Sequence, residues 1–190
     1  MVSDKKIDFM REAMKCAVRA AKHNDVPIGA VIVRNGEIIA RGENRVQKKM
    51  DPTEHAEIVA IRSACKKLEK KFLDGCDIYV TLEPCAMCAT AISFARIKSV
   101  VYAADDPKGG GINFGAKVYE NDEHLWKPNV ERSSVYSDSS GKMLKDFFRK
   151  LRIKNMNKAT GVAQDSSVVK RRVKKIRKRI RKTIKSIVRG

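Results

Sequence analysis

The stretch PIGAVIVRNGEIIARGEN, residues 27–44, is the part of the sequence that most clearly predicts the fold. Two apolar runs flank Asn35-Gly36, a dipeptide that is typical of a two-residue turn between antiparallel strands. The first run is almost wholly apolar, so it predicts a central strand in a sheet that is covered on both faces. We therefore expect a hairpin inside a sheet that lies between two layers of helices.

The segments outside the hairpin predict helices in alternation with further strands. Apolar residues at three- and four-residue steps predict helices over residues 4–23, 53–71, 85–97 and 139–154. Apolar runs predict strands at residues 76–82, 99–104 and, more weakly, 130–136. Residues 105–129 are rich in glycine and irregular. This order favours an α/β domain of three layers with a mixed sheet.

The positive charge of the chain is unevenly distributed. Residues 166–190 contain twelve of the 41 Lys and Arg residues and no Asp or Glu, whereas residues 1–165 contain 29 basic and 22 acidic residues. We therefore predict a domain over residues 1–155, followed by a linker and basic tail over residues 156–190. Ile and Val recur at helical spacing in the tail, which indicates an amphipathic helix that forms on a polyanion such as RNA. A tail without a role of its own is the alternative.

The composition also bears on where the protein works. No run approaches the ~20 apolar residues that span a bilayer, and the narrow apolar stripe of the tail lacks Trp, Phe and Leu, so no stable membrane association is expected. The first residues do not predict a signal peptide. Five cysteines, an odd number, favour free thiols and metal ligands in a reducing cytoplasm over disulfides.

Two short motifs, HAE at residues 55–57 and PCAMC at residues 84–88, predict a metal site. Cys85 and Cys88 are three residues apart, so on a helix they share a face and can bind one metal. The start of a helix also favours the thiolate, which is the form that binds. His55 and Glu57 are two apart and would diverge on a regular helix, so we expect that helix to begin close to His55.

One His and two Cys provide three zinc ligands and leave the fourth position open, which is typical of a catalytic site rather than a structural one. Each motif alone is weak, since a C-x-x-C pair can be a redox pair or two buried thiols, but together they are specific. Cys16 and Cys65 lie on predicted helices and are interpreted as packing residues. His23 and His124 are interpreted as surface or loop residues.

These residues resemble the zinc-dependent cytidine-deaminase superfamily, whose signature is H-x-E with P-C-x-x-C. Several further stretches are similar to the bacterial tRNA-specific adenosine deaminases: VPIGAVIV (26–33), GENR (42–45), DPTEHAEIVAIR (51–62), YVTLEPCAMC (79–88), ARI (95–97) and DFFR (146–149). The resemblance spans about residues 5–155 and implies a three-layer α/β/α fold with a five-stranded mixed sheet. It also implies one Zn²⁺ per chain, a homodimer and a tRNA anticodon loop as substrate. The stretch GGGINFG (109–115) departs from the family pattern.

The resemblance further implies an activity and the residues that carry it. Adenosine at the wobble position becomes inosine, with His55, Cys85 and Cys88 as zinc ligands and Glu57 as the proton-transferring catalytic residue. Four residues match substrate-binding positions: Asn44 at the base, Val26 and Pro27 as apolar walls, and Asp106 beside the ribose. On the last predicted helix, Phe148 is interpreted as facing RNA rather than the core, and Arg149 as part of a cationic surface for phosphates.

Two other functions compete with this interpretation. The first is a deaminase of a free nucleobase or nucleoside, such as guanine or cytosine, and the basic DFFR helix argues against it. The second is a non-catalytic RNA-binding module that uses zinc only as a structural staple. Glu57 and the absence of an obvious fourth ligand argue against this second alternative.

Overall fold

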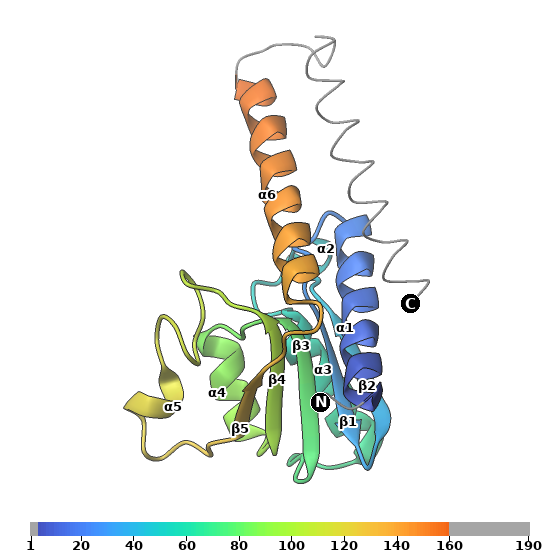
Figure 1. Cartoon of the computed structure of the whole chain (residues 1–190), viewed down its shortest axis with the longest axis vertical. Coiled ribbons are helices and arrows are strands. Elements are labelled where there is room, and N and C mark those ends of the chain that lie inside the picture. The colour runs from blue at the N-terminus through green and yellow to red at the C-terminus, as the bar shows by residue number, and fades with distance from the viewer. Residues whose placement is uncertain (1–3, 160–190) are drawn as a thin grey trace.

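The computed structural model describes residues 4–159 and contains a five-stranded sheet between helical layers (Figure 1). In chain order the elements are α1 (Asp4–Lys22), β1 (Gly29–Arg34), β2 (Glu37–Glu43), α2 (Val46–Lys49), α3 (Ala56–Leu68), β3 (Cys76–Leu82), α4 (Ala86–Phe94), β4 (Ser99–Ala104), α5 (Val118–Asn121), β5 (Asn129–Arg132) and α6 (Ser137–Ala159). The basic tail lies outside the described residues.

The sheet has the strand order β2-β1-β3-β4-β5. Strand β1 is antiparallel to β2 and β3, whereas β3, β4 and β5 are parallel, so the expected mixed sheet of five strands is confirmed. The predicted hairpin is also confirmed. Asn35 and Gly36 have φ angles of 52° and 77°, the left-handed pair that a tight two-residue turn requires.

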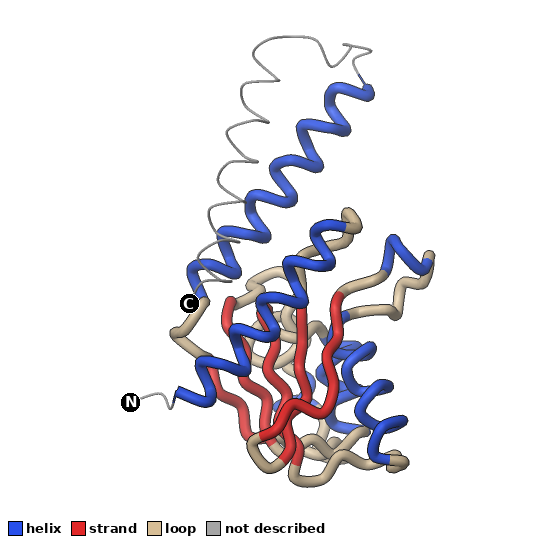
Figure 2. Tube along the Cα trace, turned by 90° about the vertical axis from the view of Figure 1, so that its right-hand side faces the viewer, coloured by secondary structure: helices blue, strands red, loops and turns tan. Residues whose placement is uncertain are grey.

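Alternate residues of β1 point to opposite faces and bury their side chains under different helices. Ala30 and Ile32 pack in a cluster with α3 and α4, whereas Val31 and Val33 pack in a cluster with α1. Figure 2 shows the sheet between these layers. The predicted strand that is covered on both faces is therefore confirmed as β1. It lies second in the sheet.

Helix α6 joins α1 on its face of the sheet and then extends beyond it (Figure 1). Its first turns are fixed by Met143, which packs against Met14 and Val18 of α1. The helix is longer than predicted and includes residues 156–159, which the sequence assigned to the linker. The boundary between domain and tail stays a prediction. Within residues 4–159 no helix is long and apolar enough to cross a membrane.

Strand β5 forms one edge of the sheet and is shorter than the predicted strand at residues 130–136. It ends at Arg132, and directly afterwards Ser133 Oγ accepts a hydrogen bond from Val135 N over 3.2 Å, a local turn that leads the chain from the sheet into α6. All four residues of β5 are exposed. Glu131 and Arg132 form ion pairs of 2.5 Å and 2.6 Å with Lys6 and Asp105.

Candidate active site

The two motifs meet at the starts of α3 and α4. His55 and Cys85 are the N-cap residues of these helices, each in an extended backbone conformation. His55 Nδ1 lies 3.6 Å from Cys85 Sγ and 3.5 Å from Cys88 Sγ. The expectation that the helix begins close to His55 is therefore confirmed. On a regular helix, side chains two residues apart point in nearly opposite directions. His55 precedes the first helical residue, so its side chain and that of Glu57 can face the same site.

The three side chains form a group that fits a metal ion. Their ligand atoms all lie within 4.8 Å of one another, and no other such group of three or more His, Cys, Asp or Glu side chains occurs in residues 4–159. Hydrogen bonds from Cys88 and His55 lower the pKa of Cys85 to about 4, so this sulfur is a thiolate near neutral pH. Its bond with Cys85 raises the pKa of His55. A nitrogen and two sulfur donors are the set that a soft or borderline divalent metal prefers.

Glu57 lies beside this group in the first turn of α3 and is only 3% exposed. Its Oε2 atom is buried and has no hydrogen-bond partner in the described part of the chain. Burial raises the pKa of this carboxyl to about 7. A buried polar atom without a partner is rare in folded proteins, so it indicates a site that receives a further polar group.

The segment that contains Asn44 is joined by backbone hydrogen bonds to the residue before His55 and to the end of the loop that contains Pro27. Asn44 directly follows β2, is 4% exposed, and donates its backbone N–H to Ile28 O over 3.1 Å, which holds it close to the buried Pro27. Arg45 N donates to Glu54 O over 2.9 Å, which connects this segment to the residue before His55.

Val26, the other predicted wall, is partly buried. The neighbouring carboxylate of Asp25 accepts hydrogen bonds from the backbone N–H groups of Gln47 and Lys48, over 2.7 Å and 3.2 Å. These bonds attach residues 25–27 to α2. Backbone hydrogen bonds therefore connect Asn44 to Ile28 on one side and, through Arg45, to Glu54 on the other.

Asp106 lies after β4, at the start of a glycine-rich loop that contacts the turn before α4. Its Oδ1 atom accepts hydrogen bonds from Lys108 N and Gly109 N, over 3.2 Å and 3.0 Å. Further along the loop, Gly110 forms an isolated β-bridge with Cys85. The predicted ribose-contacting residue and the metal group are therefore connected through the backbone.

Glu83, which was not predicted as a site residue, is 2% exposed and accepts four backbone hydrogen bonds from residues 106–114. Its partners lie 23 to 31 positions away in the chain, so no local spacing predicts them. The only available signal was an acidic residue between an apolar strand and Pro84.

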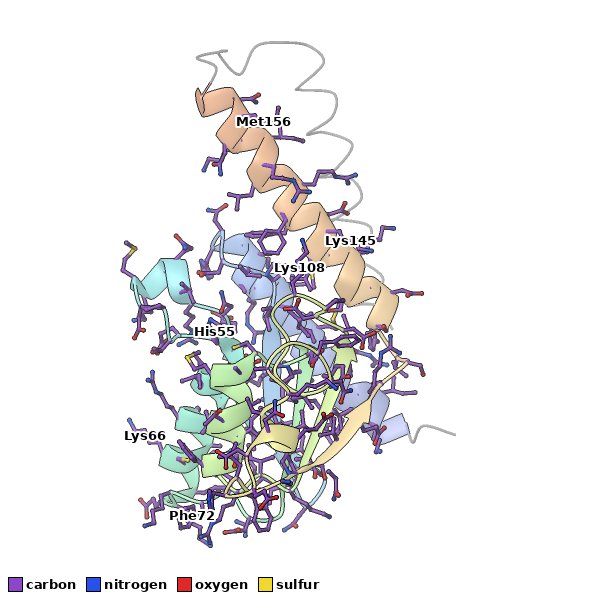
Figure 3. The ribbon with its side chains drawn as sticks, turned by 90° about the vertical axis from the view of Figure 1, so that its left-hand side faces the viewer. His55, Lys66, Phe72, Lys108, Lys145 and Met156 are labelled. Atoms are coloured by element: carbon purple, nitrogen blue, oxygen red, sulfur yellow. The ribbon has the colours of Figure 1, made fainter. Side chains whose placement is uncertain are left out.

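On α6, the adjacent aromatic residues Phe147 and Phe148 have different exposure. Phe148 is 40% exposed, and Phe147 is partly buried, with the two rings edge to face at 5.5 Å between centroids. Arg149 is less available for phosphate contacts than predicted, because its guanidinium forms an ion pair with the buried carboxylate of Asp146. Figure 3 shows Lys108 and Lys145 above His55, toward the end from which α6 projects.

A mixed sheet of this order, with a His-Cys-Cys group and a buried glutamate at two helix starts, defines a cytidine-deaminase-like protein. Residues 4–152 match the family described as MafB19-like deaminase. A tRNA-specific adenosine deaminase of Agrobacterium fabrum is 46% identical over 145 residues, which are 76% of this chain and 95% of that protein.

Two solved structures are also similar. One, from biochemical and structural studies of A-to-I editing by tRNA:A34 deaminases at the wobble position of transfer RNA, has a TM-score of 0.66 and 46% identity, and the match covers 67% of this chain and 98% of that one. A guanine deaminase of Bacillus subtilis has a TM-score of 0.52 and 31% identity, with 84% and 96% covered. The chain belongs to the family of tRNA-specific adenosine deaminases.

Proposed function

We propose that this protein is a zinc-dependent enzyme that deaminates adenosine to inosine at the wobble position of a tRNA anticodon. The observation that carries the proposal is the group of His55, Cys85 and Cys88 beside Glu57, whose buried oxygen has no partner among residues 4–159. The 46% identity to a relative named as a tRNA-specific adenosine deaminase supports the choice of substrate. Zinc suits one imidazole and two thiolate donors and leaves a fourth position open.

Each residue of the site has a part in this chemistry. When bound, zinc supplies a Lewis acid that activates water near neutral pH. Glu57, which is not a ligand in this proposal, accepts a proton from the attacking water and delivers it to the ring nitrogen beside the reacting carbon, while the water oxygen adds to that carbon and the amino group leaves as ammonia. Asn44 has both a donor and an acceptor for the purine edge. Val26 and Pro27 provide apolar contact with the base, and Asp106 contacts the ribose.

Deamination should depend strongly on the form in which adenosine is presented. An adenosine at the wobble position of a seven-base anticodon loop is expected to react at least about 100-fold faster than the same base in a duplex, because unstacking a paired base costs a few kcal/mol. The measurement is inosine formation at equal concentrations of hairpin, duplex and free adenosine. Equal rates for all three would contradict a loop-specific enzyme.

The 31% identity to a guanine deaminase makes a free purine base the second candidate substrate. The exposed Lys108, whose backbone N–H donates to Asp106, favours RNA, since a free base has no phosphates to contact. If ammonia were released from guanine as fast as from the hairpin, a free purine base would be the better candidate substrate. A purely structural zinc module would release no ammonia from either substrate.

Two neighbouring aromatic residues provide a matched test of the RNA surface. Phe148→Ala is expected to weaken hairpin binding by about 5- to 100-fold, since stacking on a base contributes about 1–3 kcal/mol. Phe147→Ala is expected to lower the melting temperature more than it lowers RNA affinity, because this ring is partly buried. Titration of labelled hairpin together with thermal melts separates the two effects. An unchanged affinity in Phe148→Ala would remove this residue from the RNA surface.

The proposal includes a homodimer in the cytoplasm. Support for the dimer comes from α4, where Met87 and Phe94 are seven residues apart on one side of the helix and are 36% and 68% exposed. Exposed large apolar side chains on a helix that also carries the metal group suit contact with a second copy. Five free cysteines support a reducing compartment.

A further inference from the structure

Glu83 occupies an unusual place for an acidic residue. It follows β3 directly, is only 2% exposed, and its backbone N–H donates to Ala104 O at the end of β4 over 2.8 Å. No Lys, Arg or His forms an ion pair with it in the part of the chain that the structure describes. A buried carboxylate is costly unless its oxygens are satisfied by hydrogen bonds. The surroundings of Glu83 must therefore supply those bonds.

The loop after β4 supplies them from its backbone. Oε2 accepts from Asp106 N over 3.2 Å. Oε1 accepts from Ile112 N, Asn113 N and Phe114 N over 3.1, 2.8 and 3.0 Å. Hydrogen bonds to a charged acceptor are about twice as strong as neutral ones, so a single side chain holds both ends of the segment 106–114.

Two glycines of this segment allow the close approach. A Cβ atom on Gly110 would lie 2.6 Å from the carboxyl group of Glu83, and one on Gly111 would lie 2.6 Å from the carbonyl carbon of Cys85. Gly111 N also donates to Pro84 O over 2.8 Å. The stretch that departs from the family pattern is thus fitted to Glu83 on one side and to the turn with Cys85 on the other.

From these contacts we infer that Glu83 is a positioning residue for deamination. It fixes the Asp106 backbone relative to the helix start that carries Cys85, so that the group contacting the ribose and the group binding the metal keep one relative geometry. The inference rests on the proposed function, in which Asp106 contacts substrate. Glu83 itself touches neither substrate nor metal in this account, and it acts through the loop.

Glu83→Gln tests the inference with little change in shape. The carbonyl oxygen of the new side chain can keep the three bonds to residues 112–114, and its NH₂ group then faces Asp106 N–H, donor against donor. The amide of Asp106 is expected to exchange hydrogen at least about tenfold faster, with the metal content unchanged. Glu131→Gln is the control, because it removes an equally charged but exposed carboxylate that lies outside the loop. Unchanged exchange at Asp106 would overturn the inference.

A double-mutant cycle with Asp106→Asn separates positioning from mere support of the fold. Glu83→Gln and Asp106→Asn are each expected to lower kcat/KM on the hairpin by about 10- to 100-fold, since misplacement by about 1 Å has effects of this size. The double variant is expected to be less than threefold worse than either single variant, because Glu83→Gln misplaces the same Asp106 carboxylate that Asp106→Asn replaces. Multiplicative losses would overturn the positioning role while leaving the proposed function intact. A wild-type protein that makes no inosine would instead overturn the proposed function, and the exchange measurement would still report whether Glu83 holds the loop.

Discussion

Glu57→Ala is expected to lower kcat on a wobble-adenosine hairpin by about 100- to 10,000-fold, the range that a positioned proton-transfer group contributes. The same variant is expected to keep its fold and about one zinc ion per chain, because the proposed ligands are three other side chains. Single-turnover inosine formation and elemental analysis of the purified variant are the two measurements. Because the substitution affects proton transfer and not RNA binding, hairpin affinity is expected to change little.

Glu54→Ala provides the matched control for this experiment. Glu54 lies three residues away, and its carboxylate pairs with Arg62 at the surface over 2.7 Å. The substitution Glu54→Ala removes the same number of atoms as Glu57→Ala but changes no side chain of the metal group. Normal deamination by Glu57→Ala would refute the catalytic role, and loss of zinc from that variant would show that Glu57 is a ligand or a structural support.

Cys85→Ala is expected to reduce bound zinc to a small fraction of one per chain and to reduce deamination to background. Stability should fall as well, because a metal at 100 times its dissociation constant stabilises the folded state by about 2.7 kcal/mol. For a domain of this size the loss corresponds to a melting temperature lower by about 5–10 °C. Wild-type protein stripped with a chelator is expected to melt near the same temperature, and adding zinc should restore only the wild type.

Cys65→Ala is the control for the loss of a thiol. Cys65 lies on α3, partly buried, and belongs to no group that fits a metal among residues 4–159. It should keep zinc and activity. Full metal content in Cys85→Ala would mean that this thiol is not a ligand, whereas zinc loss from Cys65→Ala would mean that thiol substitution acts through the fold.

Much of the fold followed from local patterns in the sequence. Asn35-Gly36 between apolar runs predicted the hairpin, and the alternation of apolar periods predicted the layers. The start of α3 directly after His55 followed from the requirement that His55 and Glu57 face one site, which places His55 at or before the first helical turn. These predictions succeeded because each depends on residues that are close in the chain.

Features that depend on distant partners could not be predicted in this way. The role of Glu83 depends on hydrogen bonds from the loop after β4, about 30 positions away in the chain. Arg149 and Asp146 are close in the chain, but their ion pair depends on the burial of Asp146, which the local sequence does not indicate.

The exposed strand β5 has a consequence for self-association. An edge strand offers free backbone groups on which a second chain can add, and this is a common route to aggregation. Here the edge is only four residues long, and Glu131 and Arg132 are held in ion pairs that an incoming strand would have to displace. Short, charged edges of this kind oppose the addition of a further strand, so β5 is a poor starting point for fibre growth.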